Sequence, residues 1–190
     1  MDFDFGLLFA LFVVLAAIIV WLRVRAEEVE QVVSRTDGRT YLVRRLPDSQ
    51  EAADRLGRIN QDSKKLLEHL SAKFPKNAAV QRLVAKYNPD AISEGSPNSG
   101  YTSYSINKGE KLVICIRQSD LSFVDHNITM YVVVHELGHL MTKSVGHTKE
   151  FWAKFRFILR QAMAIGLYRK VDFDKKAEDY CSIKITSSVV

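Results

Sequence analysis

The chain has 190 residues and a formal net charge of +5. About 168 residues follow an apolar N-terminus, which suffices for one domain with its own core and excludes a chain too small to fold alone. All 27 Lys and Arg follow residue 22, whereas two of the 22 acidic residues precede it, so this part has a net charge of +7. A positive domain can bind anionic lipid, nucleic acid or an acidic substrate, or be charged for solubility alone, so charge selects no partner.

The N-terminal segment is apolar: the seventeen residues 6–22 carry no charge, and Arg23 follows them. A run of this length suffices to cross a thin bilayer, and we expect residues 1–25 to form a single transmembrane anchor. The alternative is a cleaved signal peptide, but the start Met-Asp-Phe-Asp lacks the basic residues typical of one. Because basic residues only follow the run, the positive-inside rule places the rest of the chain in the cytosol, with the lipid bilayer as a partner.

Residues 26–46 are expected to form a polar connector with a short strand at 40–45, and the main domain is expected over residues 47–187. Its first element is a long helix that opens at Asp48, which has capping-box spacing to Glu51, and ends before Pro75. Apolar residues recur on one side of this helix: Leu56, Ile59, Leu66, Leu67 and Leu70. Asn77 is expected to cap a second helix that runs to residue 87, and residues 88–100 are expected to form a loop.

Residues 101–106 and 111–117 flank the turn sequence Asn-Lys-Gly-Glu and are expected to form a β-hairpin. The second strand is apolar on both faces, so we expect it to be buried. An open edge of this hairpin could hold an extended peptide through backbone hydrogen bonds, and a purely structural strand is the alternative. Cys115 in this strand and Cys181 near the end are expected to be reduced thiols, with a disulfide between them as the alternative.

Residues 135–139 read His-Glu-Leu-Gly-His, the HExxH motif of zinc peptidases. Four residues advance a helix by about 400°, so His135 and His139 lie one turn apart on one face and can bind the same metal. An apolar stripe lies on the opposite side: Met130, Val133, Val134, Leu137 and Met141. Asn127 is a candidate N-cap. Glu136 lies about 60° from His139 around the helix, where it can act as a general base without binding the metal.

A catalytic zinc requires a third protein ligand and an open coordination position. In an unbroken helix His147 would lie about 12 Å beyond His139, so the helix must end between them. Gly146 suits the left-handed turn that ends a helix. The pattern therefore predicts a helix, a glycine turn, a histidine and a second helix, with His147 as the third ligand and Glu150 or Glu178 as alternative ligands.

The second helix carries an apolar stripe typical of core packing, formed by Phe151, Phe155, Ile158 and Ala162. Gly166 is expected to end this helix, and residues 183–186 are expected to add a last strand.

With Gly-His-Thr-Lys-Glu-Phe-Trp at 146–152 after HExxH, the sequence resembles the WLM and SprT-like small metallopeptidases, in which an aromatic residue follows a late histidine. Residues 104–117 resemble the strand pair before the zinc helix of WLM domains, and residues 180–181 resemble their closing segment. The resemblance covers about residues 47–187. It implies an α+β zincin-like fold, one zinc held by His135, His139 and His147, and Glu136 as the catalytic acid/base. Proteins crosslinked to DNA, or small modifier proteins and their conjugates, are the implied substrates.

Together these features predict a membrane-anchored zinc metallopeptidase that hydrolyses protein or peptide substrates. Zinc would lower the pKa of a water molecule toward about 7, and Glu136 would take the proton as the water attacks a peptide carbonyl. Tyr180 and Tyr104 are candidate donors to the oxyanion, with strand packing as the alternative role of each.

Two other readings stay open. The first is a non-catalytic, zinc-binding interaction module tethered to a membrane. The second is a protease that processes DNA–protein crosslinks, against which the predicted anchor argues, so that nucleic acid is a less favoured partner.

Overall fold

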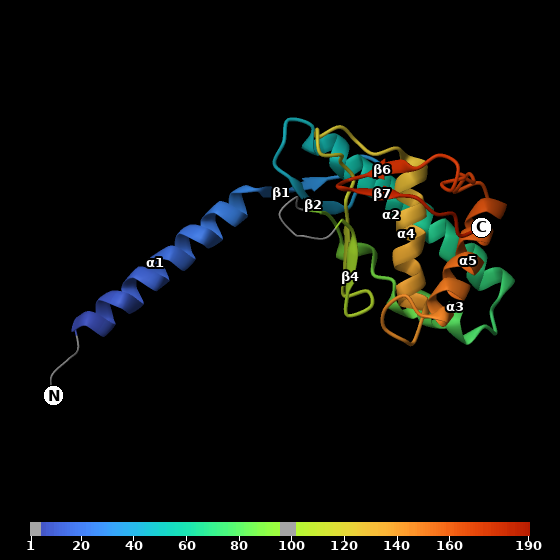
Figure 1. The fold of residues 1–190 in the computed structure, drawn as a ribbon, viewed down its shortest axis with the longest axis horizontal. Helices are drawn as coiled ribbons and strands as arrows, with labels where there is room; N and C mark the ends of the chain where they lie inside the picture. The colour runs from blue at the N-terminus through green and yellow to red at the C-terminus, as the bar shows by residue number, and fades with distance from the viewer. Residues whose placement is uncertain (1–4, 96–101) are drawn as a thin grey trace.

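The computed structural model describes residues 5–95 and 102–190 of the chain, so the predicted loop at 88–100 lies partly outside the described residues. The fold is α+β, as predicted: a mixed sheet is packed against helices, and two helices with a small hairpin complete the domain (Figure 1). One cluster of buried apolar side chains joins the sheet to all four helices of the domain.

The main sheet has five strands in the order β1-β2-β3-β5-β4. These strands are β1 (Val29–Val33), β2 (Thr40–Arg44), β3 (Ile92–Glu94), β4 (Tyr104–Ile106) and β5 (Lys111–Ile114). The pairs β1/β2 and β4/β5 are antiparallel, as expected for hairpins, whereas β2/β3 and β3/β5 are parallel. β4 therefore lies at one edge of the sheet. The strand pair at 104–117 was predicted, but β1 and β3 were predicted as connector and loop.

The long helix α2 (Ser49–Lys73) packs on the strands β1, β2 and β3. All five residues of its predicted apolar stripe are buried. Asp48 is its N-cap residue, but the Asp48 side chain makes no capping hydrogen bond and instead accepts one from Arg117. The shorter helix α3 (Ala78–Lys86) is capped as predicted, because the Asn77 side chain accepts hydrogen bonds from two backbone N–H groups; the 3₁₀ helix η1 (Pro89–Ala91) follows it.

The helices α4 (His126–Met141) and α5 (Lys149–Ala164) pack against each other, and their predicted apolar stripes are buried. The N-cap of α4 is Asp125 rather than Asn127, since the Asp125 carboxylate accepts hydrogen bonds from the backbone of residues 127 and 128. The Asn127 side chain instead exchanges two hydrogen bonds with the backbone of Arg169.

A disulfide joins Cys115, just after β5, to Cys181, in the turn between β6 (Glu178–Tyr180) and β7 (Ile183–Ile185). The prediction of two reduced thiols was therefore wrong. The two residues are 66 positions apart, so no local pattern signals that the small hairpin folds back onto the end of β5. The disulfide fixes this hairpin beside α4 (Figure 1).

An ionic cluster forms around the buried Arg117, three residues after the end of β5. Arg117 donates from Nε to Glu94 over 2.8 Å and from Nη1 to Asp48 over 2.7 Å. Glu94 is 5% exposed and also accepts the backbone N–H of Arg44. The Arg117 guanidinium lies 4.1 Å from the centre of the Phe123 ring. This cluster connects α2 to the central strands.

The N-terminal helix α1 (Phe5–Glu27) extends away from the domain (Figure 1). In the residues that the structure describes, no helix combines the length and apolar character needed to cross a membrane. The prediction of a membrane location is thus wrong, and neither the predicted transmembrane anchor at 1–25 nor the predicted bilayer partner is supported. The uncharged run of seventeen residues spans about 26 Å as a helix, which suits a thin bilayer but is less than the hydrocarbon core of about 30 Å in a typical bilayer.

Candidate active site

A cleft of about 870 Å³ lies between α4, the 102–108 segment and the β6–β7 hairpin. Residues of α4, of the segment that follows α4 and of the hairpin all line it, and the hairpin contributes the apolar side chains of Ile183 and Ile185. The lining residues are Lys86, Thr102, Ser103, Tyr104, Ser105, Asn107, Lys108, Tyr131, Val132, His135, Glu136, His139, Ser144, Val145, Gly146, His147, Tyr180, Ile183 and Ile185. The cleft thus contains both motif histidines, the motif glutamate and His147.

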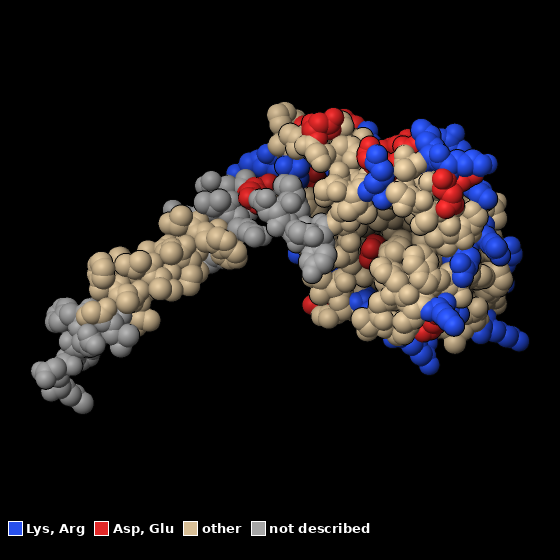
Figure 2. All heavy atoms as spheres, in the orientation of Figure 1, with Lys and Arg blue, Asp and Glu red and all other residues tan. Residues whose placement is uncertain are grey.

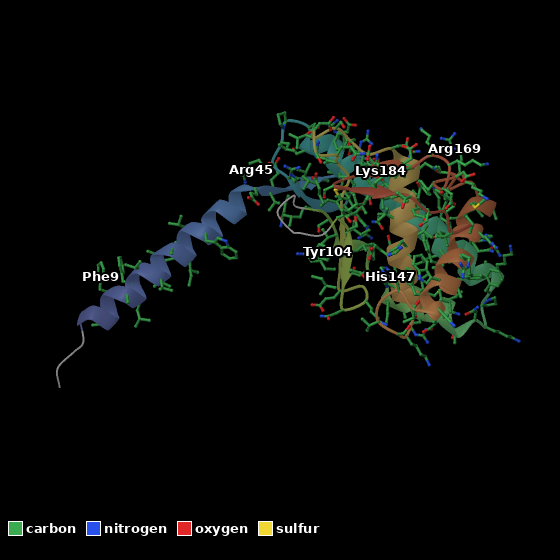
Figure 3. The ribbon with its side chains drawn as sticks, viewed as in Figure 1. Phe9, Arg45, Tyr104, His147, Arg169 and Lys184 are labelled. Carbon is green, nitrogen blue, oxygen red and sulfur yellow. A yellow bond between two sulfur atoms is a disulfide. The ribbon has the colours of Figure 1, made fainter. Side chains whose placement is uncertain are left out.

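Three histidines converge in this cleft: His135 and His139 from α4 and His147 from the segment that follows it. One candidate ligand atom of each lies within 4.8 Å of those of the other two. The Nε2 atoms of His135 and His147 are 2.9 Å apart. Figure 3 shows His147 beside α4. The helix ends at Met141 and Gly146 has φ of 78°, so the chain breaks and turns as the sequence predicts.

The chemistry of these three side chains fits a metal ion. Two nitrogens bound to a tetrahedral zinc lie about 3.3 Å apart. This distance lies between the 2.9 Å of the His135–His147 pair and the 4.8 Å within which all three ligand atoms fall. Burial, together with the neighbouring histidines, lowers the pKa of His135 to about 3, and burial also lowers the pKa of His139 to about 4. Both imidazoles are therefore neutral at pH 7 and present lone pairs, as a metal requires.

Glu136 lies on the same helix but outside the histidine cluster. It is 5% exposed, and burial raises the pKa of its carboxyl to about 7, although a hydrogen bond with the Ser105 hydroxyl lowers it. A carboxyl group with a pKa near neutrality can both accept and donate a proton at physiological pH. Ser105 lies on β4, so the sheet edge orients this carboxyl group.

Aromatic side chains of α5 hold the histidine rings. The His139 ring stacks on Phe151 at 4.2 Å between ring centres, and the His135 ring meets Phe151 and Phe155 edge-on at 4.7 and 5.1 Å. Close packing of the two helices makes these contacts possible. A Cβ atom on Gly138 would lie only 3.1 Å from the Phe151 ring, so the glycine of the motif permits this approach.

The other candidates named from the sequence do not join the histidine cluster. The Glu150 carboxylate accepts hydrogen bonds from the backbone of residues 143 and 144, and Glu178 pairs with Lys176, so neither joins the histidines. The Tyr180 side chain is buried, and its hydroxyl donates to the Cys115 carbonyl oxygen over 2.8 Å. The hydroxyl proton is therefore already used in a hydrogen bond to the backbone. Tyr104 lines the cleft from β4 (Figure 3).

Among the side chains that line the cleft, Ser105 and Lys108 were missed by sequence reasoning. A weak signal for Ser105 is its place in the strand before the HExxH helix, where a polar side chain can face the site. Lys108 is the second residue of the hairpin turn, and nothing in a single sequence indicates where a turn lysine points.

Charge is distributed unevenly over the molecule. On the face in Figure 2, Lys and Arg lie mostly on the side of the domain away from α1, while the centre of the face is largely free of charged side chains. Arg169 and Lys184 are two exposed basic residues of the domain (Figure 3).

Several viral proteins are similar to this chain. An uncharacterised protein of Acanthamoeba polyphaga mimivirus is 27% identical over 187 residues, which is 95% of each chain. Uncharacterised proteins of invertebrate iridescent viruses 6 and 3 are 31% and 36% identical over 84 residues, which is 43% of this chain and 47% and 50% of theirs. No family model matches the chain.

Among solved structures, the crystal structure of Wss1 from Saccharomyces cerevisiae matches with a TM-score of 0.51 and 19% identity, covering 66% of this chain and 88% of that chain. The structure of a Wss1 mutant matches with a TM-score of 0.50 and covers 92% of that chain. The chain therefore has a Wss1-like α+β fold.

Proposed function

We propose that this protein is a zinc-dependent metallopeptidase that hydrolyses peptide bonds in protein substrates. The observation that carries the proposal is the convergence of His135, His139 and His147 in a cleft that also contains the buried Glu136. When bound by the three imidazoles, zinc supplies a Lewis acid that polarises a peptide carbonyl and acidifies a water molecule.

The protein side chains perform the remaining steps. Glu136 accepts a proton from the attacking water at its carboxylate and returns it to the leaving amine, and the Ser105 hydroxyl orients this carboxylate. Among the residues that the structure describes, β4 pairs with β5 at the edge of the sheet and Ser105 of β4 lines the cleft, so an extended peptide in the cleft would lie alongside β4. Backbone pairing at a strand edge binds peptides with little sequence preference.

Zinc binding tests the ligand set. The purified full-length protein is expected to bind one zinc, and His147→Ala is expected to lose most of it at equimolar metal, because two imidazoles remain where a catalytic site needs three protein ligands. Zinc content after gel filtration is the measurement. Full occupancy in His147→Ala combined with complete loss in Glu150→Ala would instead assign Glu150 as the third ligand.

The substrate class that we propose is protein crosslinked to DNA. One observation favours it over other proteins: the fold is Wss1-like, which supports the resemblance from which this class was inferred. The net charge of +7 after residue 22 is compatible with it. A basic surface binds nucleic acid through its phosphates, so DNA would bring the attached protein to the cleft.

A matched pair of substrates tests this proposal. One protein, offered free and crosslinked to an oligonucleotide, is expected to be cleaved faster in the crosslinked form, with an advantage that decreases as salt rises from 50 to 200 mM. Equal rates for the two forms at every salt concentration would reject DNA as the recruiting element. If neither form is cleaved while zinc is bound, the non-catalytic zinc-binding module becomes the better interpretation.

A further inference from the structure

The segment that carries His147 has no regular structure of its own. Residues 142–148 connect α4 to α5, and most of their side chains are exposed, with Val145 at 85%. An exposed irregular segment has few apolar contacts to hold it and loses much conformational entropy when it is fixed. The His147 ring also contacts Phe151 and Trp152, at 4.8 and 5.6 Å between ring centres. The polar contacts of the segment hold its backbone, and so help to place the third imidazole.

Lys108 binds one side of this segment. Its Nζ donates to three consecutive carbonyl oxygens, those of Thr142, Lys143 and Ser144, at 2.8, 2.5 and 2.9 Å. The first of these residues follows the last residue of α4, so the ammonium group also lies at the negative end of the helix dipole. An ammonium group has three donors, and all three are used here.

The turn that carries Lys108 is built to reach this position. Asn107, Lys108 and Gly109 all have positive φ, at 46°, 55° and 117°. A Cβ atom on Gly109 would lie 2.4 Å from the carbonyl oxygen of Lys86, so the turn fits closely against the end of α3. A closely packed turn therefore positions the Lys108 side chain.

Glu150 binds the other polar side of the segment. Its carboxylate accepts the backbone N–H groups of Lys143 and Ser144, at 3.4 and 3.3 Å, and the Ser144 hydroxyl at 3.0 Å. These hydrogen bonds, with that of the Ser144 hydroxyl first, lower the pKa of Glu150, so it is charged at pH 7. Lys108 thus holds the carbonyl groups, and Glu150 holds the N–H groups, of the same two residues.

We propose that Lys108 and Glu150 are positioning residues that together fix the His147 segment in its metal-binding conformation. The inference rests on the proposed zinc site and assigns no contact with metal or substrate to either residue. It gives Glu150 a role in the site without making it a ligand. Removing either charge would leave the three histidines present but would require the segment to be ordered when zinc binds.

Lys108→Met tests the proposal, because methionine keeps an unbranched side chain of similar length and removes all three donors. In the metal-free full-length protein, amide hydrogen exchange of residues 142–147 is expected to become faster. Zinc affinity, measured by competition with a chelator, is expected to fall about 10–100-fold, as for other residues that support metal ligands. Lys108→Arg, which keeps the charge and several donors, is expected to recover part of this loss.

Lys111→Met is the matched control, since Lys111 is an exposed lysine of the same hairpin, and it is expected to change neither quantity. Glu150→Gln is expected to accelerate exchange of the Lys143 and Ser144 amides specifically. Unchanged exchange and unchanged zinc affinity in Lys108→Met would overturn the inference, as would a fall in affinity fully accounted for by global unfolding of the metal-free variant. If the wild-type protein binds no zinc, the proposed function fails, whereas the exchange measurement still tests the positioning role.

Discussion

Glu136→Gln is expected to retain its zinc while its peptidase activity falls at least about a hundredfold, and by up to about ten-thousandfold. Glutamine has nearly the same shape as glutamate and can still accept a hydrogen bond from Ser105, but it cannot take a proton from water. The substitution also removes a buried ionisable group, so no loss of stability is expected to confuse the result. Single-turnover cleavage and zinc content, measured on one preparation, separate catalysis from metal binding.

Glu178→Gln is a suitable control, because Glu178 pairs with Lys176 and lies outside the histidine cluster. Its activity is expected to match that of the wild type. Cleavage by Glu136→Gln at the wild-type rate would exclude Glu136 as the proton acceptor and would require another general base.

Arg117→Met is expected to lower the free energy of unfolding by about 3–5 kcal/mol, because it leaves the buried Glu94 without its charged partner. For a domain of this size, the change corresponds to a fall in melting temperature of about 6–20 °C. Calorimetry of the metal-free protein measures this directly and avoids any contribution from bound zinc.

Two further variants test whether the loss of stability in Arg117→Met comes from leaving a buried charge unpaired. Arg39→Met breaks the exposed pair with Asp90 and is expected to cost less than about 1 kcal/mol. The double variant Arg117→Met/Glu94→Met is expected to recover much of the lost stability, since replacing both members of a buried pair by apolar residues is often close to neutral. A double variant as unstable as Arg117→Met alone would show that packing of the guanidinium on Phe123, rather than charge pairing, dominates.

The site was predictable from the sequence wherever its geometry is local. His135, Glu136 and His139 share one helix, and Gly146 signals the turn that brings His147 back, so helix periodicity and one glycine suffice to bring the histidines together. The helices α2 and α5 were predictable for the same reason, because their apolar stripes are long and regular.

The remaining features depend on contacts between distant segments. β3 has three residues and forms only through parallel pairing with β2 and β5, so its sequence carries no strand signal of its own. The capping prediction for Asp48 failed because a buried arginine 69 residues away offers its carboxylate a stronger partner. The charges of Lys108 and Glu150 are visible in the sequence. The sequence does not show that both side chains bind the backbone of residues 143 and 144.

Gly138 costs α4 about 1 kcal/mol of helix propensity relative to alanine, and the contact of the Phe151 ring explains why this cost is tolerated. The two variable positions of the HExxH motif are therefore not equivalent in this chain. Leu137 is fully buried and must be apolar, whereas residue 138 must be small because an aromatic ring from α5 occupies the space in front of it. A sequence pattern for finding further proteins with this site should therefore couple a glycine before the second histidine to an aromatic residue early in the following helix.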